Sequence, residues 1–374
     1  MKKILIIGAG FGGLTAVSSL SAYKPKLDIT LIDKKQTSDF LPNLPDCIGR
    51  GINPEFLSFD LSSYSKKRGV QFLKEEVLTV NPVKKEAVTA TKTLAYDYLI
   101  IASGAETNFY GNENIKKNAY KLYSVDDAKE INRCLKTGDF QNCIVSGGGY
   151  TGIEAATNLR LYFNRRSLNK RIIIAERAGS ILGPLPEWMK QYTNNNLKKL
   201  GIELLLNTSV ERIEAGSIHL SSGEVFDKTM LIWAAGVRTA DFISNMPIEK
   251  DKQGRIKVDE YLRLDESCFV IGDAASFSYK NVTLRMAVQF AIFQARSACR
   301  NIIRAIQGKK LKKYFPVDLG YIIPMANNRS CGAVLGVNFT GALATFLHFT
   351  MCVYRSWSVR NKLGIIGGLL KGGG

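Results

Sequence analysis

Histidine and closely spaced cysteine pairs are scarce in this sequence of 374 residues, and each shortage removes a class of chemistry. Only His219 and His348 are present, which disfavours histidine acid–base catalysis and a histidine-rich metal site, so we expect no metal. The seven cysteines contain no CxxC or CxxxxC pair, so the redox-active dithiol of a disulfide reductase is missing. This odd, scattered set also argues against a disulfide scaffold and favours a reducing compartment.

Acidic residues are also short, with 33 Asp and Glu against 51 Lys and Arg and a net charge of +18. The excess of positive charge predicts attraction to an anionic surface, such as nucleic acid, anionic lipid or an acidic partner. The hydrophobic content of 45% and the charged content of 22% are ordinary for a globular protein. The length of the chain predicts two or three domains.

The start of the chain carries the pattern of a dinucleotide-binding βαβ unit. A short apolar run at residues 4–7 indicates a buried strand, a helix is predicted over 14–22, and a second strand over 28–32 ends in Asp33. The glycines of a GxGxxG motif stand between the first strand and the helix: Gly8, Gly10 and Gly13. Such glycines let the backbone and the helix N-terminus approach a diphosphate, while the later carboxylate accepts hydrogen bonds from a ribose. This stretch by itself predicts bound FAD or NAD.

A cleaved signal peptide is the rival interpretation of the same start, because the chain opens with a basic stretch followed by apolar and small residues. The apolar run at residues 4–7 is very short before the glycines begin, and a leader would leave the position of Asp33 unexplained. We therefore expect the motif to belong to the folded protein.

The same pattern returns in the middle of the chain, where a second GxGxxG motif is formed by Gly147, Gly149 and Gly152. A predicted helix over 153–163 and a strand over 171–175 follow, and the strand ends in Glu176. A carboxylate here repels a 2′-phosphate and favours NADH over NADPH, although the neighbouring Arg177 could accommodate that phosphate.

Each motif is followed by a small β-meander and by a strand that ends in small residues, at Ser103-Gly104 and again at Gly236. The chain therefore contains an internal duplication, and two dinucleotide sites predict FAD and a nicotinamide that exchange electrons. A further buried strand over 269–271 is followed by Asp273, which can accept hydrogen bonds from the ribityl hydroxyls of a flavin. A long helix is predicted over 283–307.

Together the stretches IIGAGFGGL, YDYLIIASGA, SGGGYTGIE, LIWAAGV and FVIGDAA resemble the two-dinucleotide flavoprotein reductases, the superfamily of the pyridine nucleotide-disulfide reductases. Within it the chain is similar to type II NADH dehydrogenase, the single-subunit NADH:quinone oxidoreductase. Glu154 and the tail GALATFLHFTMCVYRSWSVRNKLGIIGGLLK carry this closer resemblance. It implies an α/β fold with two Rossmann-type domains, the NAD domain inserted in the FAD domain, and a membrane-associating C-terminal segment.

The resemblance implies an FAD-binding domain over 1–111 and 241–308, an NAD(P)H-binding domain over 112–240, and a C-terminal membrane-surface or dimerisation segment over 309–374. The implied FAD-binding residues are Gly8, Gly10, Gly12, Gly13, Asp33, Ser103, Gly104, Asp273 and Ala274. The implied NADH-binding residues are Gly147, Gly149, Gly152, Glu176 and Gly236.

The resemblance also implies the reaction, in which NADH reduces the flavin and the flavin passes two electrons to a membrane quinone. Glu154 would then lie near nicotinamide and flavin, and Gln289 would contact the flavin or the acceptor. One departure bears on the acceptor: Arg285 stands where the family's AQxAxQ segment has its first glutamine. The sequence therefore leaves open the quinone type and whether the acceptor is a quinone.

The C-terminal segment predicts a position at the cytoplasmic face of the cell membrane. From Lys309 onward there are nine basic residues and one acid, Asp318, and residues 330–354 carry no charged side chain. Glycines and Asn338 interrupt the first half of this stretch and disfavour a membrane span, so we expect a strand over 331–337 and an interfacial amphipathic helix over 341–357. A docked helix that forms a homodimer is the alternative.

Three other functions stay open from the sequence. A sulfide:quinone oxidoreductase shares the architecture but uses paired cysteines at the flavin, and no such pair is recognisable here. A soluble NAD(P)H-dependent reductase would serve a protein acceptor. A flavoprotein that binds nucleic acid would use the basic surface, but no motif or aromatic-interleaved basic patch supports it, so we expect no nucleic acid partner.

Overall fold

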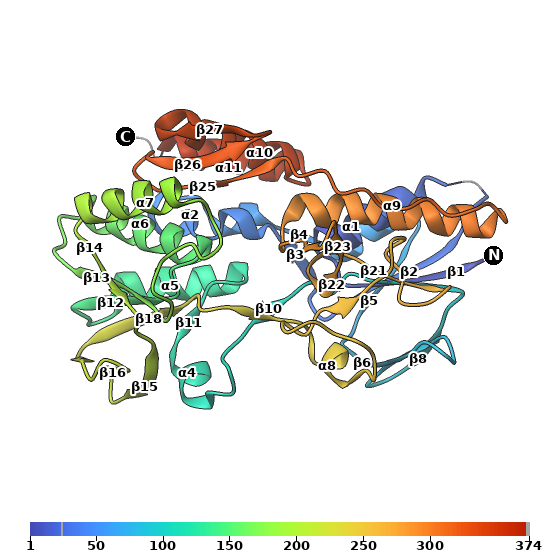
Figure 1. The fold of residues 1–374 in the computed structure, drawn as a ribbon, viewed down its shortest axis with the longest axis horizontal. Coiled ribbons are helices and arrows are strands. Elements are labelled where there is room, and N and C mark those ends of the chain that lie inside the picture. Colours follow the sequence, from blue (N-terminus) through green and yellow to red (C-terminus); the bar gives the residue numbers. More distant parts are fainter. Residues whose placement is uncertain (24, 372–374) are drawn as a thin grey trace. The chain divides into compact units, whose positions relative to one another are not determined.

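The computed structural model describes residues 1–23 and 25–371, and these form two compact units between which the chain alternates (Figure 1). The first unit contains Met1–Ser38, Phe59–Glu106 and Val237–Leu319. The second contains Asp39–Ser58, Thr107–Gly236 and the chain from Gly320 onward. Three short strands lie where the chain passes between units: β3 (Thr37–Asp39), β4 (Ser58–Asp60) and β10 (Glu106–Thr107).

The first unit is built on a parallel five-stranded sheet in the order β21-β9-β1-β2-β5. Its elements up to the first crossing of units are β1 (Lys3–Ile7), α1 (Phe11–Ser21) and β2 (Asp28–Asp33). Next come α3 (Leu61–Lys66), β5 (Gln71–Lys74), β6 (Val77–Asn81), β7 (Glu86–Thr89), β8 (Thr93–Ala95) and β9 (Tyr98–Ile101). The last part has β19 (Val237–Arg238), α8 (Asp241–Asn245), β20 (Ile256–Lys257), β21 (Cys268–Val270), η3 (Gly272–Ala274), β22 (Ala275–Ser276), β23 (Ser278–Tyr279), β24 (Val282–Thr283) and α9 (Val288–Ile306).

Both faces of this sheet are covered, which explains why its strands read as unbroken apolar runs. Helices α1 and α9 pack side by side on one face, while the β6–β7–β8 meander and α8 cover the other (Figure 1). Leu5 and Ile7 point toward the meander and form one core with Val80, Ala87 and Phe242. The expected helix over 283–307 begins only at Val288, because Thr283 ends the β23–β24 hairpin and residues 284–287 are neither helix nor strand.

The second unit repeats this plan, with a parallel sheet in the order β11-β18-β12-β13-β14. Its first elements are η1 (Leu41–Asn43), α2 (Asp46–Gly49), η2 (Pro54–Leu57), α4 (Glu113–Asn118), β11 (Tyr120–Lys121), α5 (Val125–Thr137), β12 (Asn142–Ser146), α6 (Tyr150–Asn164) and β13 (Arg171–Glu176). It continues with α7 (Glu187–Lys199), β14 (Ile202–Leu206), β15 (Val210–Glu214), β16 (Ser217–Leu220), β17 (Val225–Phe226) and β18 (Thr229–Trp233). The order β18-β12-β13-β14 matches β9-β1-β2-β5 strand for strand, so the duplication expected from the sequence is a structural one.

The C-terminal part of the second unit is a β-hairpin sheet followed by two helices. It contains β25 (Gly320–Ile323), β26 (Ser330–Val334), β27 (Val337–Thr340), α10 (Gly341–Arg355) and α11 (Val359–Lys371). The prediction of one strand over 331–337 is wrong at its C-terminal end, because β26 ends at Val334. Leu335 and Gly336 both adopt positive φ and form the turn that leads into β27. The helix expected from residue 341 is confirmed, and α11 follows it. No helix among residues 1–23 and 25–371 is both long and apolar enough to span a bilayer.

Candidate active site

The glycine loops of the two units have the same backbone contacts. A Cβ on Gly13 would overlap the carbonyl oxygen of Gly8, and a Cβ on Gly152 would overlap that of Gly147. Glycine is therefore required where helices α1 and α6 pack against the loops that precede them. This close packing directs each helix N-terminus toward the carboxyl end of the neighbouring strand.

Gly10 and Gly149 stand at the N-termini of these two helices and have open space in front of them. Each glycine is the N-cap residue of its helix and has no side chain to accept a hydrogen bond from the first N–H groups of that helix. A Cβ on either glycine would meet nothing within 4 Å. The first backbone N–H groups of both helices are thus left for an anionic group, and the helix dipole favours a diphosphate there. Both loops fit the diphosphate of a dinucleotide.

Asp33 and Glu176 hold the two loops through matching hydrogen bonds. Asp33 accepts the N–H of Ala9 at 2.7 Å and that of Lys35 at 2.8 Å. Glu176 accepts the N–H of Gly148 at 2.6 Å and that of Ala178 at 2.7 Å. Each carboxylate bridges its glycine loop to its own strand end and keeps lone pairs for the hydroxyls of a ribose. Burial raises the pKa of Asp33, although both N–H groups lower it.

Two neighbouring strands bring further predicted residues to the same edge of the first sheet. Ser103 follows β9, and its buried hydroxyl oxygen has no hydrogen-bond partner among the described residues. Asp273 lies in the η3 turn after β21, where the N–H of Gly272 is held by the side-chain oxygen of Gln294 at 2.7 Å. Burial raises the pKa of Asp273 to about 6, while Arg255 acts in the opposite direction. An unpartnered hydroxyl and a half-buried carboxyl fit the polar hydroxyls of a flavin cofactor.

The structure thus gathers the predicted flavin-binding residues at the carboxyl edge of the first sheet, on loops after β1, β2, β9 and β21 or on the first turn of α1: Gly8, Gly10, Gly12, Gly13, Asp33, Ser103, Gly104, Asp273 and Ala274. The predicted nicotinamide residues lie at the corresponding edge of the second sheet: Gly147, Gly149, Gly152, Glu176 and Gly236. Ligand sites of open α/β sheets lie at this edge.

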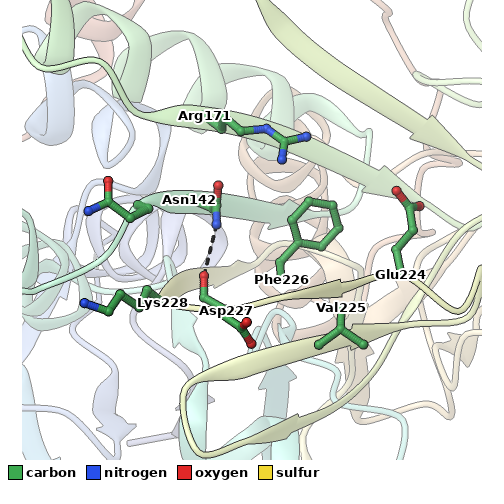
Figure 2. Close-up of a pocket in the computed structure, with 8 residues that line it drawn as sticks. Asn142, Arg171, Glu224, Val225, Phe226, Asp227 and Lys228 are labelled. Carbon is green, nitrogen blue, oxygen red and sulfur yellow. Dashed lines mark hydrogen bonds between the residues drawn. The ribbon is translucent and has the colours of Figure 1, made fainter.

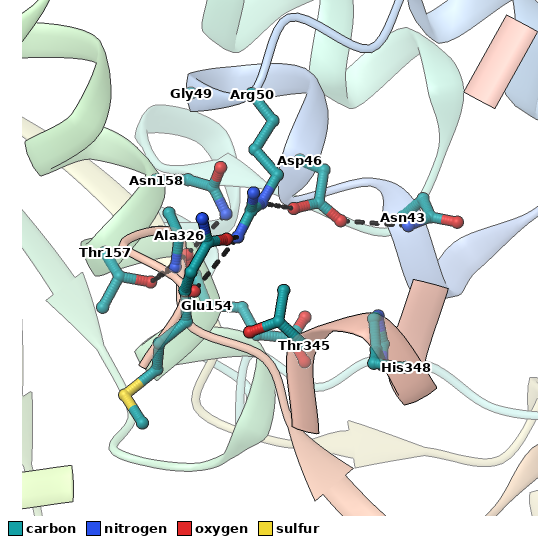
Figure 3. A network of polar contacts seen from close by, with 12 residues as sticks. Asn43, Asp46, Gly49, Arg50, Glu154, Thr157, Asn158, Ala326, Thr345 and His348 are labelled. Carbon is teal, nitrogen blue, oxygen red and sulfur yellow. Dashed lines mark hydrogen bonds and ion pairs between the residues drawn. The ribbon is translucent and has the colours of Figure 1, made fainter. Parts of the chain in front are cut away.

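Glu154, in the second turn of α6, adjoins a buried ion pair that sequence reasoning did not identify (Figure 3). Arg50 Nε lies 3.2 Å from Asp46 Oδ1, and Asn43 donates to the other oxygen of Asp46 at 3.0 Å. Arg50 also donates to the carbonyl of Met325 at 3.1 Å. The only sequence signal for the pair was its i,i+4 spacing on a short helix.

These surroundings act directly on the protonation of Glu154. Burial raises the pKa of Glu154 well above its ordinary value, and the negative charge of Asp46 raises it further. The pKa of Asp46 is itself raised by burial and lowered by Arg50. Glu154 therefore keeps its proton at pH values where an exposed glutamate is ionised, which suits a group that delivers or holds a proton.

Gln289, in the first turn of α9, is engaged with the segment that follows the helix. Its Nε2 donates to Asp318 Oδ1 at 2.9 Å, and its Oε1 accepts the N–H of Leu319 at 2.9 Å. Arg285 donates to the same carboxylate, with Nη2 2.8 Å from Oδ1 of Asp318. Arg285, which departs from the family motif, is thus paired with Asp318, the only acid of the C-terminal segment. The contact of Gln289 with flavin or acceptor stays a prediction.

A surface hollow in the second unit is lined by Asn142, Arg171 and residues 224–228, but it does not belong to this site (Figure 2). Asn142 begins β12 and Arg171 begins β13, so the hollow lies at the amino ends of the parallel strands. Asn142 is tied to the carbonyl of Asp227 at 3.0 Å, and Arg171 to Glu203 at 2.7 Å. The glycine loops lie at the opposite ends of the same strands.

The seven cysteines form no disulfide. All seven are free thiols, and six of them are buried. Among the described residues there is also no group of three or more His, Cys, Asp or Glu side chains that could hold a metal ion.

Comparison with known proteins agrees with this geometry. A family model described as pyridine nucleotide-disulphide oxidoreductase matches residues 2–295, and the chain belongs to this family. The type II NADH:quinone oxidoreductase of Staphylococcus aureus (strain NCTC 8325 / PS 47) is 26% identical, with 92% of this chain and 93% of that protein covered. The corresponding protein of Staphylococcus haemolyticus is also 26% identical over the same shares.

Solved structures share the fold. The structure of NDH2 from Plasmodium falciparum in complex with RYL-552 superimposes with a TM-score of 0.86 at 19% identity and covers 99% of this chain and 98% of that one. The sulfide:quinone oxidoreductase of Aquifex aeolicus gives a TM-score of 0.82 at 18% identity, over 97% and 92% of the two chains. At these identities the likeness concerns the fold alone, and the expected two-dinucleotide flavoprotein architecture is confirmed.

Asp273→Asn will stabilise the cofactor-free protein above pH 6. The pKa of Asp273 is raised from 3.8 to about 6 by folding, so the folded state binds a proton more tightly than the unfolded chain. Wild-type stability therefore falls as pH rises from about 4 to about 6, by up to about 3 kcal/mol. The amide lacks this loss, so the two proteins will differ most above pH 6 and least below pH 4 in chemical denaturation. A difference that does not change with pH would contradict this.

Arg50→Met will destabilise the protein by about 3–5 kcal/mol, because it leaves the Asp46 carboxylate buried without its partner. The double variant Asp46→Asn/Arg50→Met will recover at least half of this loss, since no unpaired charge remains. Denaturant unfolding measures both. Lys2→Met is the matched control, because the Lys2–Asp97 pair is exposed and screened by water and so contributes little to stability. Equal losses in the single and double Arg50 variants would contradict the role of the buried charge.

Proposed function

We propose that this member of the pyridine nucleotide-disulphide oxidoreductase family is an FAD-dependent NADH:quinone oxidoreductase of type II. The observation that carries the proposal is the pair of glycine loops, each closed by a carboxylate and each with an uncapped helix N-terminus. Two such sites on one chain suit a reductant and a prosthetic group that exchange electrons. The relatives named for NADH and quinone, matched over nearly their whole length, supply the acceptor class.

The first unit is proposed to bind FAD and the second NADH. The domains expected over 1–111 with 241–308 and over 112–240 differ from these units mainly in Asp39–Ser58, which belongs to the second unit. In the first unit the α1 N-terminus would hold the diphosphate, Asp33 the ribose, and Ser103 and Asp273 the polar part of the flavin chain. In the second unit the α6 N-terminus and Glu176 would do the same for NADH, and the negative charge of Glu176 disfavours a 2′-phosphate.

A flavin held by these residues would supply the two-electron chemistry that links a nicotinamide to a quinone. The chain contributes binding, orientation and control of protons. Glu154 is proposed to hold a proton in the second unit, with Asp46 raising its pKa and Arg50 keeping Asp46 in place. Gln289 is proposed to orient the acceptor at the start of α9, with its amide fixed by Asp318 and Leu319.

The C-terminal helices are proposed to hold the protein on the cytoplasmic face of the cell membrane, as a peripheral protein. Exposed apolar side chains stand along both helices, including Leu343 (55% exposed), Phe346 (66%) and Leu363 (64%). Arg360 and Lys362 are the nearby cations for anionic headgroups. Such a stripe of apolar and basic residues suits an interfacial helix, whereas a homodimer would use the same face against a second copy.

Anaerobic NADH will bleach the flavin absorbance of the purified protein, and a short-chain quinone will then restore it. The reason is that two sites on one chain pass electrons from one nucleotide to the other. Absorbance spectroscopy in a sealed cuvette measures both steps. A colourless protein that cannot be reconstituted with FAD, or a flavin that sulfide reduces faster than NADH, would overturn the proposal.

Two alanine variants serve as matched controls for the assignment of the sites. A Cβ on Gly10 or on Gly149 meets nothing within 4 Å of the protein, so both variants will fold. Gly10→Ala will lose FAD, whereas Gly149→Ala will keep FAD and need about tenfold more NADH for bleaching, since one backbone contact to a diphosphate is blocked. The reverse pattern would exchange the two assignments.

Substitution of the exposed apolar side chains of the tail will release the protein from vesicles. Leu343→Ser/Phe346→Ser/Leu363→Ser will lower the bound fraction on anionic vesicles, by roughly tenfold for each side chain in partition coefficient. Substitution is preferred to deletion because Phe349 and Ile365 of the same helices are buried. Flotation measures binding, with Val225→Ser as the matched exposed control. Unchanged binding together with loss of a dimer in sedimentation would identify a dimer interface instead.

A further inference from the structure

Four exposed apolar side chains gather on the first unit, on two segments well separated in the chain. The β23–β24 hairpin contributes Tyr279 (36% exposed) and Val282 (66%), and the segment after α9 contributes Phe315 (65%) and Val317 (54%). We call these four residues the hairpin patch. None of them belongs to the C-terminal helices α10 and α11, so the proposed membrane contact of those helices does not account for it.

Two aromatic contacts join the segments and hold the side chains of the patch together. Phe277 and Tyr314 are buried and meet edge to face, with ring centroids 5.1 Å apart. Tyr279 and Phe315 stand one step further out, also edge to face, with centroids 6.3 Å apart. The buried pair anchors both segments, and the exposed pair presents its rings to the outside.

An ion pair also joins the two segments. Arg285 lies two residues after the hairpin, and Asp318 lies one residue after Val317. The carboxylate of Asp318 accepts hydrogen bonds from Arg285 and Gln289. The patch is thus continuous along the chain with the start of α9, where the acceptor is proposed to bind. This connection gives the patch a place in the proposed reaction.

The hairpin turn is shaped to project its apolar side chains. Lys280 and Asn281 both adopt positive φ, at 49° and 63°, as a two-residue type I′ turn requires. Val282 follows directly on this turn and is two-thirds exposed. The turn residues themselves are polar, and the apolar Tyr279 and Val282 flank them as directly paired residues of the two strands. This places two apolar side chains beside a lysine at the end of the hairpin, an arrangement that suits shallow insertion into a membrane interface.

The surroundings of the patch are basic. Five exposed lysines stand on the two segments: Lys280, Lys309, Lys310, Lys312 and Lys313. Glu260 is paired with Lys313 at 2.8 Å, and Asp318 is paired with Arg285. The chain from 309 to 317 contains no acid. Lysines around aromatic and aliphatic side chains match the headgroups and the acyl boundary of an anionic bilayer.

We propose that the hairpin patch is a second membrane contact, in which Tyr279, Val282 and Phe315 insert into the interface of an anionic bilayer. The proposal rests on the proposed function only for the membrane location. It goes beyond that function because it assigns a lipid contact to the first unit and places the start of α9 next to the bilayer that dissolves a quinone. A protein partner or a second copy of the chain is an alternative occupant that the experiment separates.

Phe315→Trp provides a direct test in the full-length flavoprotein. With vesicles of anionic phospholipid brominated near the top of the acyl chains, the fluorescence added by this tryptophan will be quenched. The parent protein, with its three tryptophans, is the blank. Val83→Trp is the matched control, because Val83 is 93% exposed in the first unit and stands beside Lys84 and Lys85. Quenching of Phe315→Trp no greater than that of Val83→Trp overturns the proposal.

Val282→Ser/Phe315→Ser provides the second arm. Both side chains are exposed, so thermal melting will be unchanged, while vesicle partitioning will fall by roughly tenfold to a hundredfold on anionic lipid. Partitioning equal to that of the parent, or a loss of self-association without a loss of lipid binding, overturns the proposal. The assays need no turnover, so their outcome is separate from that of the NADH and quinone experiment.

Discussion

One carboxylate per unit, bonded to the backbone of its own glycine loop, is the interaction on which the rest of the structure depends. Asp33 and Glu176 each accept two N–H groups, one from the loop after the first strand and one from the chain just beyond the second. Each loop is also held by one backbone hydrogen bond. The N–H of Gly8 donates to the carbonyl of Ile32, and the N–H of Gly147 donates to the carbonyl of Ala175, both at 2.8 Å. The result is a rigid loop that leaves the helix N-terminus open.

A second constraint is the burial of a charged pair, Asp46 and Arg50, in the second unit. In the second unit Asp46 and Arg50 are nearly inaccessible to solvent; the charge of Asp46 raises the pKa of Glu154, and Arg50 acts to lower the pKa of Asp46. A buried ion pair contributes little net stability because desolvation offsets its attraction. Its effect here is on the pKa of Glu154, and Met325 and Asn328 fix Arg50 from the C-terminal part of the same unit.

Several features were predictable because they depend on neighbours in the chain. The glycine spacings, the apolar strands and the carboxylates at the strand ends all belong to local βαβ units, and the structure has the same strand order in both. The Asp46–Arg50 pair and the Arg285–Asp318 pair were not predicted, because each takes its role from segments far away in sequence. The turn at Leu335 was also missed, since positive φ at leucine has no sequence signal of its own.

The sequence by itself determined the two dinucleotide-binding motifs, the family and the basic, weakly apolar tail, because these follow from residue type and spacing along the chain. Only the tertiary structure decided which polar groups share a site. It showed that Glu154 adjoins a buried ion pair, that Gln289 is held by Asp318, and that Tyr279 and Phe315 form one exposed patch. The physical reason is that burial and pairing depend on contacts between distant segments, and these contacts exist only once the chain has folded.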